Sequence, residues 1–142
     1  MSTRVALDTS ALMMPVELDV RLFDELDRLL GGVSHTPDSD QPRADPLEVV
    51  APQAVVEELR RLSEKGGTEG TAASVGHDLA TERCLVVDTE ASYADDALVE
   101  LARDGAADYV VTNDRPLRDR VLEEGRPVIA LRGRNKLAIT QP

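Results

Sequence analysis

Aromatic residues, cysteine and long apolar runs are all scarce in this sequence of 142 residues. It has no tryptophan, one phenylalanine and two tyrosines, so its hydrophobic core has to be built from aliphatic side chains. Such a core suits a parallel sheet covered by helices better than a sandwich or a small barrel. The single cysteine, Cys84, excludes an internal disulfide and a zinc site built from cysteines. Because Cys84 lies in an apolar run, we expect it to be a small buried hydrophobe.

Segments that would cross or enter a membrane are also missing. No apolar run approaches the roughly 20 residues that span a bilayer. The N-terminus lacks the apolar stretch of a secretion signal. We therefore expect a cytoplasmic protein without a membrane partner. The length is typical of one domain, so we predict a single domain over residues 1–142.

Lysine is rare, whereas acidic residues are abundant. Only Lys65 and Lys136 are lysines among 16 basic residues, and 27 acidic residues bring the net charge to -11. A strongly negative surface by itself disfavours binding to nucleic acid. However, many acids with few lysines resemble the composition of proteins from salt-loving archaea, in which the acidic surface keeps the protein hydrated. On that interpretation the net charge reflects the solvent and does not exclude a nucleic-acid substrate.

Short apolar runs alternate with helical patterns along the chain. We predict strands at 4–7, 47–51, 84–87, 109–112 and 128–131, with a short last segment at 137–139. Helices are predicted at 20–30, 52–64, 71–79, 94–103 and 116–124, and a further helix start at 8–10. The polar stretch 34–45 is predicted to be a flexible insertion within one domain. This alternation predicts a three-layer α/β/α sandwich with a central parallel sheet of about five strands.

Acidic residues follow two of these strands at the point where each strand ends. Asp8 comes directly after the first strand, and Asp114 comes after the fourth. In parallel α/β sheets the ligand site lies at the carboxyl ends of the strands, so we expect both side chains to face one crevice. Glu58 and Asp95 lie on predicted helices that could place their carboxylates against the same crevice.

Several carboxylates in one place repel each other, and a divalent cation resolves that conflict. Mg²⁺ prefers oxygen ligands and usually binds through a few carboxylates together with water and phosphate. A pair of such ions can activate water and stabilise the leaving oxygen of a phosphodiester. No cysteine is placed as a nucleophile, and His35 and His77 lie in a loop and a weak helix. The residues therefore favour a carboxylate–metal mechanism.

Four segments of the chain resemble the acidic motifs of the PIN-domain nucleases, in the order of that family. They are VALDTSALM (5–13), VVEELRRL (55–62), YADDALVELA (93–102) and VVTNDRPLRDRV (110–121). The third and fourth are similar to the ribosomal-RNA-processing branch of the family and to archaeal relatives labelled as VapC-type toxins. The resemblance implies a flavodoxin-like sandwich, Mg²⁺ or Mn²⁺ as cofactor, and an endoribonuclease that hydrolyses RNA. It also implies a homodimer, and an antitoxin or a pre-ribosomal particle as partner.

The resemblance also assigns roles to individual residues. Asp8, Glu58, Asp95 and Asp114 match the four catalytic acids, and Asp8, Asp95 and Asp114 would bind the metal. Asp95 and Asp96 are alternatives for the third acid, because adjacent residues on a helix point about 100° apart. Aligning the YADD motif places Asp95 at the family's acid, and Asp96 is then a further candidate metal ligand or an acid at the helix N-terminus. Thr9 or Ser10, together with Asn113, match the polar neighbours that hold water or substrate phosphate.

Basic residues crowd the last third of the chain and are the candidate RNA-binding face. They are Arg115, Arg118, Arg120, Arg126, Arg132, Arg134 and Lys136. Arginine binds phosphate through its fork of donors, and we take Arg115 and Arg118, which follow the fourth acid, as candidate substrate ligands. Ordinary pairing with surface acids is the alternative. Tyr93 either stacks on an unpaired base or packs at the start of a helix.

Other functions stay open at this point. Each acid taken singly is also explained as a helix cap, a turn residue or a solvated charge. A catalytically inactive PIN-fold module that binds RNA or protein is the main alternative, and a structure-specific DNA nuclease would share the chemistry. A phosphoacceptor domain would need a lysine near the end of the sheet, and an aspartate-nucleophile phosphohydrolase would need an acid at Ser10. Both are disfavoured.

Overall fold

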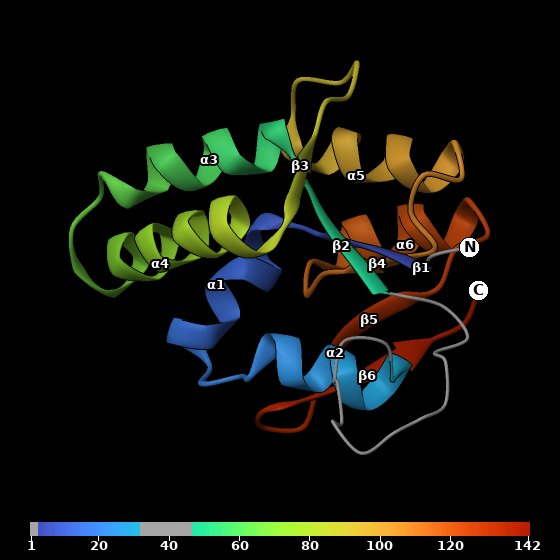
Figure 1. Ribbon diagram of the computed structural model, residues 1–142, viewed down its shortest axis with the longest axis horizontal. Helices are drawn as coiled ribbons and strands as arrows, with labels where there is room; N and C mark the ends of the chain where they lie inside the picture. Colours follow the sequence, from blue (N-terminus) through green and yellow to red (C-terminus); the bar gives the residue numbers. More distant parts are fainter. Residues whose placement is uncertain (1–2, 32–46) are drawn as a thin grey trace, which may run out of the picture.

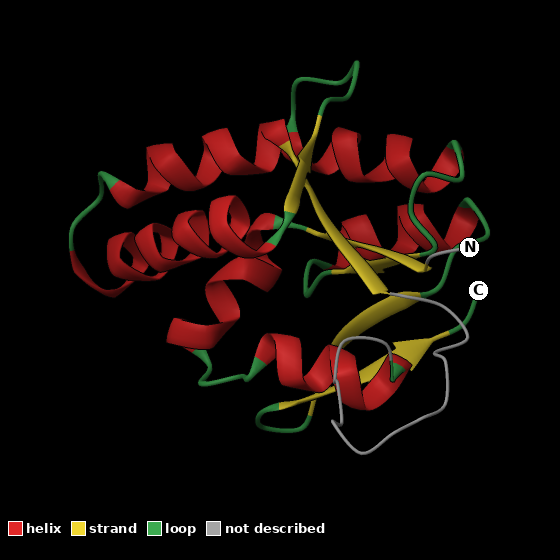
Figure 2. Cartoon of the chain, in the orientation of Figure 1, coloured by secondary structure: helices red, strands yellow, loops and turns green. Residues whose placement is uncertain are grey.

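The computed structural model describes residues 3–31 and 47–142, so the insertion predicted at 34–45 lies outside the described residues. One sheet runs through the middle with helices on both sides (Figures 1 and 2). The strands are β1 (Thr3–Leu7), β2 (Leu47–Pro52), β3 (Leu85–Val87), β4 (Tyr109–Val111), β5 (Val128–Arg132) and β6 (Lys136–Thr140). The helices are α1 (Thr9–Glu17), α2 (Leu22–Leu30), α3 (Gln53–Ser63), α4 (Gly67–Arg83), α5 (Ala94–Arg103) and α6 (Arg115–Glu123).

The sheet has the strand order β3-β2-β1-β4-β5-β6. The first five strands in this order are parallel, and β6 pairs antiparallel with β5. The predicted parallel sheet of about five strands between helices is thus confirmed. The short segment expected at 137–139 is a full edge strand. Gly133 has a φ of 76°, and this left-handed glycine allows the three-residue turn that sends β6 straight back along β5.

Two groups of helices cover the sheet. The helices α5 and α6 pack against each other and against the central strands, while α1 packs against α4 and α2. Right-handed crossovers place helices on opposite faces when the strand order changes direction, and that change lies between β1 and β4. The helix α3 contacts both α4 and α5, so it connects the two layers. No helix in the described ranges is long and apolar enough to span a bilayer.

The core is aliphatic, as the scarcity of aromatics predicts. The largest fully buried side chains are leucine, methionine, isoleucine and valine. Cys84 is only half-buried, but it packs against this core, and its burial raises the pKa of the thiol to about 12. The helix α4 extends well beyond the predicted 71–79. A Cβ at Gly76 would lie 2.8 Å from the Leu12 carbonyl oxygen, so this glycine allows a close approach to α1 and does not interrupt the helix.

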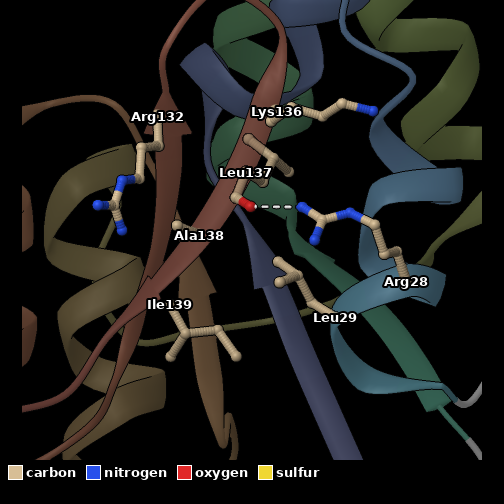
Figure 3. A pocket seen from close by; sticks show the side chains of 7 residues that line it. All are labelled: Arg28, Leu29, Arg132, Lys136, Leu137, Ala138 and Ile139. Atoms are coloured by element: carbon tan, nitrogen blue, oxygen red, sulfur yellow. Dashed lines mark hydrogen bonds between the residues drawn. The ribbon is translucent and has the colours of Figure 1, made fainter.

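The buried Glu25 and the exposed Arg28 of α2 cover the outer edge of β6 at Leu137. Glu25 of α2 is 6% exposed, and its Oε1 accepts hydrogen bonds from Leu137 N at 2.8 Å and from Arg28 Nη2 at 2.8 Å. The same Arg28 nitrogen donates to the Leu137 carbonyl oxygen at 2.7 Å (Figure 3). The hydrogen bond from Arg28 is the main reason that the pKa of Glu25 is lowered to about 2. Glu25 and Arg28 thus pair with the peptide groups of Leu137 as a further strand would.

We expect Glu25→Ala to destabilise the protein by about 1–3 kcal/mol, because the buried Leu137 N–H loses its acceptor. Urea unfolding at neutral pH measures this difference. Since the pKa of Glu25 is lowered on folding, its stabilisation is present above about pH 4.5 and is lost as the pH falls towards 2. The gap between wild type and variant should therefore narrow over that range. The exposed neighbour Asp24 serves as the control, and Asp24→Ala should change stability by less than about 0.5 kcal/mol.

Candidate active site

The candidate site lies where the strand order reverses, between β1 and β4. In open α/β sheets this switch point forms a crevice outside the carboxyl ends of the strands. Asp8 directly follows β1, and Asp114 follows β4 after two intervening residues. The two strands are neighbours in parallel register, with Ala6 opposite Val110. The sheet topology therefore places the first and fourth predicted acids side by side.

Asp8 is a buried helix cap. Its residue is 3% exposed, and its Oδ1 accepts hydrogen bonds from Ala11 N at 2.7 Å and from Ser10 Oγ at 2.8 Å. Its Oδ2 accepts a hydrogen bond from the Thr112 hydroxyl. Burial raises the pKa of Asp8 from 3.8 to about 6, against the opposing effect of these three hydrogen bonds. The carboxylate is thus rigidly oriented, yet its negative charge is costly in the absence of a positive partner.

Thr112 links the two strand-end acids. Its hydroxyl donates to Asp8 and accepts a hydrogen bond from the backbone N–H of Asp114 at 3.0 Å. Asp114 in turn caps α6, where its Oδ1 accepts from Leu117 N at 2.9 Å. Sequence reasoning missed Thr112, because a β-branched residue after two valines fits a strand equally well. Its position two residues before Asp114 was the available signal.

Asp95 and Glu58 complete the group of acids. Asp95 is in the first turn of α5, and Glu58 is half-buried on α3. Partial burial is the main cause of a raised pKa at Asp95, and the negative charges of Asp114 and Glu58 raise it further. The charge of Asp95 also contributes to the raised pKa of Asp8. The structure therefore brings Asp95 within electrostatic reach of each of the other three acids.

Asp96 faces a different partner. Its Oδ1 lies 2.8 Å from Arg120 Nη2 of α6. Arg120 also lowers the pKa of Asp95, although it does not outweigh burial and the surrounding acids. The two adjacent aspartates thus have different partners. Asp95 lies near the other acids, and Asp96 links α5 to α6 through Arg120.

The donor set suits a hard cation. Carboxylate oxygens with a nearby hydroxyl are the ligands that Mg²⁺ and Mn²⁺ take in proteins. Burial raises the pKa values of Asp8 and Asp95, and the charges of Asp114 and Glu58 raise that of Asp95 further. Across 3–31 and 47–142, no three His, Cys, Asp or Glu side chains lie close enough together to hold an ion by direct contact. Mg²⁺ usually keeps several waters and binds through only one or two carboxylates. The residues therefore fit a hydrated ion.

Among the predicted polar neighbours, Ser10 and Asn113 make hydrogen bonds within the fold, whereas Thr9 does not within the described residues. Ser10 Oγ donates to Asp8 and accepts from Asn113 N at 3.2 Å. Asn113 Oδ1 accepts from Leu131 N at 2.9 Å, so this side chain extends the pairing between β4 and β5 past the end of β4. The Thr9 hydroxyl is buried and has no hydrogen-bond partner within the described residues. Thr9 is thus the neighbour with an unused polar atom.

The residues of the predicted basic face differ in their exposure and pairing. Arg115, at the start of α6, is exposed, and Arg118 is half-buried with its Nε 3.5 Å from Asp119 Oδ1. Arg120 is paired with Asp96, and Arg126 Nε donates to the Ala102 carbonyl oxygen at 3.2 Å. The remaining three basic residues lie on the β5–β6 hairpin.

Tyr93 precedes α5, two residues before Asp95, and is 76% exposed. Its predicted alternative as a packing residue is therefore wrong. Its role as a stacking platform for a base stays a prediction.

Comparison with known proteins agrees with this geometry. A family model described as PIN like domain matches residues 5–134, and the chain therefore belongs to the PIN-like domain family. Ribonuclease VapC4 of Methanocaldococcus jannaschii is 32% identical over 88 residues, which cover 61% of this chain and 67% of that protein. A UPF0178 protein of Caulobacter vibrioides is 50% identical over 50 residues, 35% of this chain and 31% of that protein.

Solved structures show the same fold. The PIN domain endonuclease Utp24 superposes with a TM-score of 0.72 at 22% identity, covering 98% of this chain and 92% of that one. A domain of a functionally unknown protein from Methanocaldococcus jannaschii has a TM-score of 0.57 at 15% identity, with 93% of each chain covered. The predicted resemblance to the PIN family, and the α/β fold that it implies, are confirmed.

We expect Asp8→Asn to stabilise the metal-free protein increasingly as the pH rises from 4 to 7. The pKa of Asp8 is raised to about 6 in the folded protein, so the penalty for its buried charge is absent below about pH 4 and complete above about pH 6. Each pKa unit corresponds to about 1.4 kcal/mol, which gives up to about 3 kcal/mol at neutral pH. Thermal unfolding in EDTA measures the difference. Glu57→Gln, on the exposed side of α3, should show no such trend, and a flat difference for Asp8→Asn would contradict the assignment.

Proposed function

We propose that this protein is a metal-dependent endoribonuclease that hydrolyses RNA phosphodiester bonds with Asp8, Glu58, Asp95 and Asp114. One observation carries the proposal: in a PIN-like fold, Asp95 lies within electrostatic reach of Asp8, Glu58 and Asp114, which come from three other segments, and Asp8 and Asp95 have raised pKa values. The similarity to Ribonuclease VapC4 supports RNA as the substrate class. The cofactor is Mg²⁺ or Mn²⁺, held by Asp8, Asp95 and Asp114 through oxygen atoms and bound water.

The residues of the chain divide the work. A bound divalent cation would supply the positive charge that lowers the pKa of an attacking water and neutralises the phosphodiester. Asp8 is held in place by Ala11 N, Ser10 and Thr112, so it presents its carboxylate without reorganisation. Glu58 of α3, whose charge acts on Asp95, would accept a proton from the attacking water.

Substrate contacts would come from groups beside the acids that the fold leaves free. The Thr9 hydroxyl is buried and unpaired among the described residues, so it suits an ordered water. The exposed Arg115 follows Asp114 directly, and its guanidinium suits the phosphate that flanks the scissile bond. Arg118 lies one turn further along α6. Ser10 and Asn113 act instead by positioning Asp8 and the loop that carries Asp114.

The cellular role is proposed at the level of class. Cytoplasmic RNA processing and a toxin-type ribonuclease both fit this site, with a pre-ribosomal particle or an antitoxin as the respective partner. A homodimer would bring two crevices to one RNA. Affinity purification of the protein from native cells distinguishes the two roles. Capture of an antitoxin would support the toxin role, and capture of a pre-ribosomal particle would support RNA processing.

We expect the wild type to cut a labelled structured RNA only when Mg²⁺ or Mn²⁺ is present. Asp8→Asn should lower the rate by about 100-fold or more, since loss of even an outer-shell partner of a metal site costs roughly 10–100-fold. The assay is run at high salt, with circular dichroism to confirm that each variant is folded. Glu57→Gln is the matched control and should retain the wild-type rate. A folded wild type that binds RNA without cutting it would instead indicate an inactive PIN-fold binding module.

The two adjacent aspartates provide a second test of the site. We expect Asp95→Asn to lower kcat about 100-fold or more, because Asp95 lies among the acids and is a proposed metal ligand. Asp96→Asn removes only an exposed pair with Arg120, so it should change kcat less than about threefold and stability by less than about 1 kcal/mol. Single-turnover cleavage of the same RNA measures both. The reverse order of effects would make Asp96 the third acid.

A further inference from the structure

Positive charge is concentrated at the C-terminal end of the chain. Residues 125–142 contain four basic residues and no acidic residue, whereas the preceding part contains 12 basic and 27 acidic residues. Three of the four, Arg132, Arg134 and Lys136, are exposed on the β5–β6 hairpin. In a protein with a net charge of -11, such a segment is where a polyanion meets the least repulsion.

This hairpin forms a cavity with α2. The cavity has a volume of about 500 Å³ and lies between the end of α2 and β6 (Figure 3). We call this cavity, together with the exposed Arg134 in the turn beside it, the hairpin surface. Its lining combines apolar and basic side chains: Leu29, Leu137, Ala138, Ile139, Arg28, Arg132 and Lys136. The base and the sugar-phosphate of a nucleotide need this combination of an apolar floor and a cationic rim.

The positive charge of the hairpin surface is only partly neutralised. Glu25 is the acid beside it, and its carboxylate is buried and already accepts from Arg28 and Leu137 N. Lys136 Nζ lies 3.8 Å from Glu25, but the lysine side chain is 67% exposed and free to turn outward. Arg132 and Arg134 form no ion pair with any residue that the structure describes. Lys136 is thus the hairpin cation that lies near Glu25, whereas the Arg132 side chain points away from Lys136 (Figure 3).

The hairpin is joined to the loop that carries Asp114. Asn113, next to Asp114, accepts a hydrogen bond from Leu131 N of β5 at 2.9 Å, so the catalytic loop is joined to the strand that begins the hairpin. The strands β4, β5 and β6 are consecutive in the sheet. Since neighbouring strands lie about 4.8 Å apart, β6 is roughly 10 Å from β4, which is close enough for one strand of RNA to contact both.

We propose that the hairpin surface binds the sugar-phosphate backbone and an unpaired base of the RNA strand on one side of the scissile bond. The inference rests on the proposed ribonuclease function and adds a binding site separate from the four acids. The closeness of the hairpin to the loop that carries Asp114 favours RNA over an acidic peptide, which would not need to lie near the acids. The acids repel phosphate, and the hairpin cations offset that repulsion next to the site. Arg132, Arg134 and Lys136 therefore determine affinity and leave the chemical step unchanged.

The salt dependence of RNA binding tests the proposal. Anisotropy of a labelled single-stranded RNA is measured with the full chain in EDTA, so binding is observed without cleavage. Each phosphate contact to single-stranded nucleic acid contributes about 0.7 to the slope of log K against log salt. We expect Arg132→Ala, Arg134→Ala and Lys136→Ala each to reduce the slope by about 0.7, and the triple variant by about 2. Circular dichroism at every salt concentration confirms folding.

Matched controls remove the same charge elsewhere. Arg60 and Arg61 are exposed at the end of α3, and Arg60→Ala and Arg61→Ala should leave the slope as in the wild type. In single-turnover cleavage, the hairpin variants should weaken the apparent affinity several-fold with kcat unchanged.

Several outcomes overturn the proposal. These are no binding of RNA by the wild type at low salt, unchanged slopes in the hairpin variants, and equal losses in the α3 controls. Binding of a polyglutamate peptide that is lost in the hairpin variants, while RNA binding is retained, would assign the surface to an acidic protein partner. If the wild type cleaves RNA but the hairpin variants bind RNA like the wild type, the proposed ribonuclease function stands and only the hairpin binding site is refuted. If the hairpin variants bind RNA more weakly but the wild type does not cleave it, the RNA-binding site stands and the proposed catalytic role of the four acids is refuted.

Discussion

The hydroxyl of Thr112 is the contact on which the geometry of the candidate active site depends. It donates to the buried carboxylate of Asp8 and accepts from the backbone of Asp114, so one side chain sets the relative position of the acids after β1 and β4. Each acid also caps the helix that follows it, through Ala11 N and Leu117 N. The capping interactions that begin α1 and α6 thereby orient the carboxylates, and the same bonds serve folding and the proposed chemistry.

Ionising Asp8 and Asp95 costs free energy, and several neighbouring contacts reduce that cost. Burial raises the pKa of Asp8 to about 6, and Asp95 is raised by burial and by its acidic neighbours. Without a cation the ionised form of Asp8 is therefore destabilised by burial, and its hydrogen bonds only partly offset this cost. Arg120 is tied to Asp96 and moderates the charge at Asp95 without entering the group of acids. A site with this balance has a high demand for positive charge, which a metal ion and the approaching arginines would meet.

The sequence predicted the features that depend on local pattern and on the geometry of parallel sheets. Alternating apolar runs and helices indicated the sandwich, and the strand-end positions of Asp8 and Asp114 indicated the crevice. The features that the sequence did not predict depend on contacts between segments that are distant along the chain. A threonine at the end of β4 looks like any strand residue until Asp8 lies beside it, and only the partner Arg120 separates Asp96 from Asp95. Likewise, the close contact with Leu12 explains why Gly76 lies inside α4.

The pairing of Glu25 and Arg28 with Leu137 has a consequence for the protein outside its active site. An exposed edge strand presents peptide groups to which a strand from another molecule can add, and this is a common start of aggregation. On β6 the peptide groups of Leu137 are occupied by side chains of α2. At the opposite edge, β3 has only three residues, too few for stable strand addition. The two edges of the sheet are thus protected by different means, one by occupied hydrogen-bonding groups and the other by short length, which favours solubility at high protein concentration.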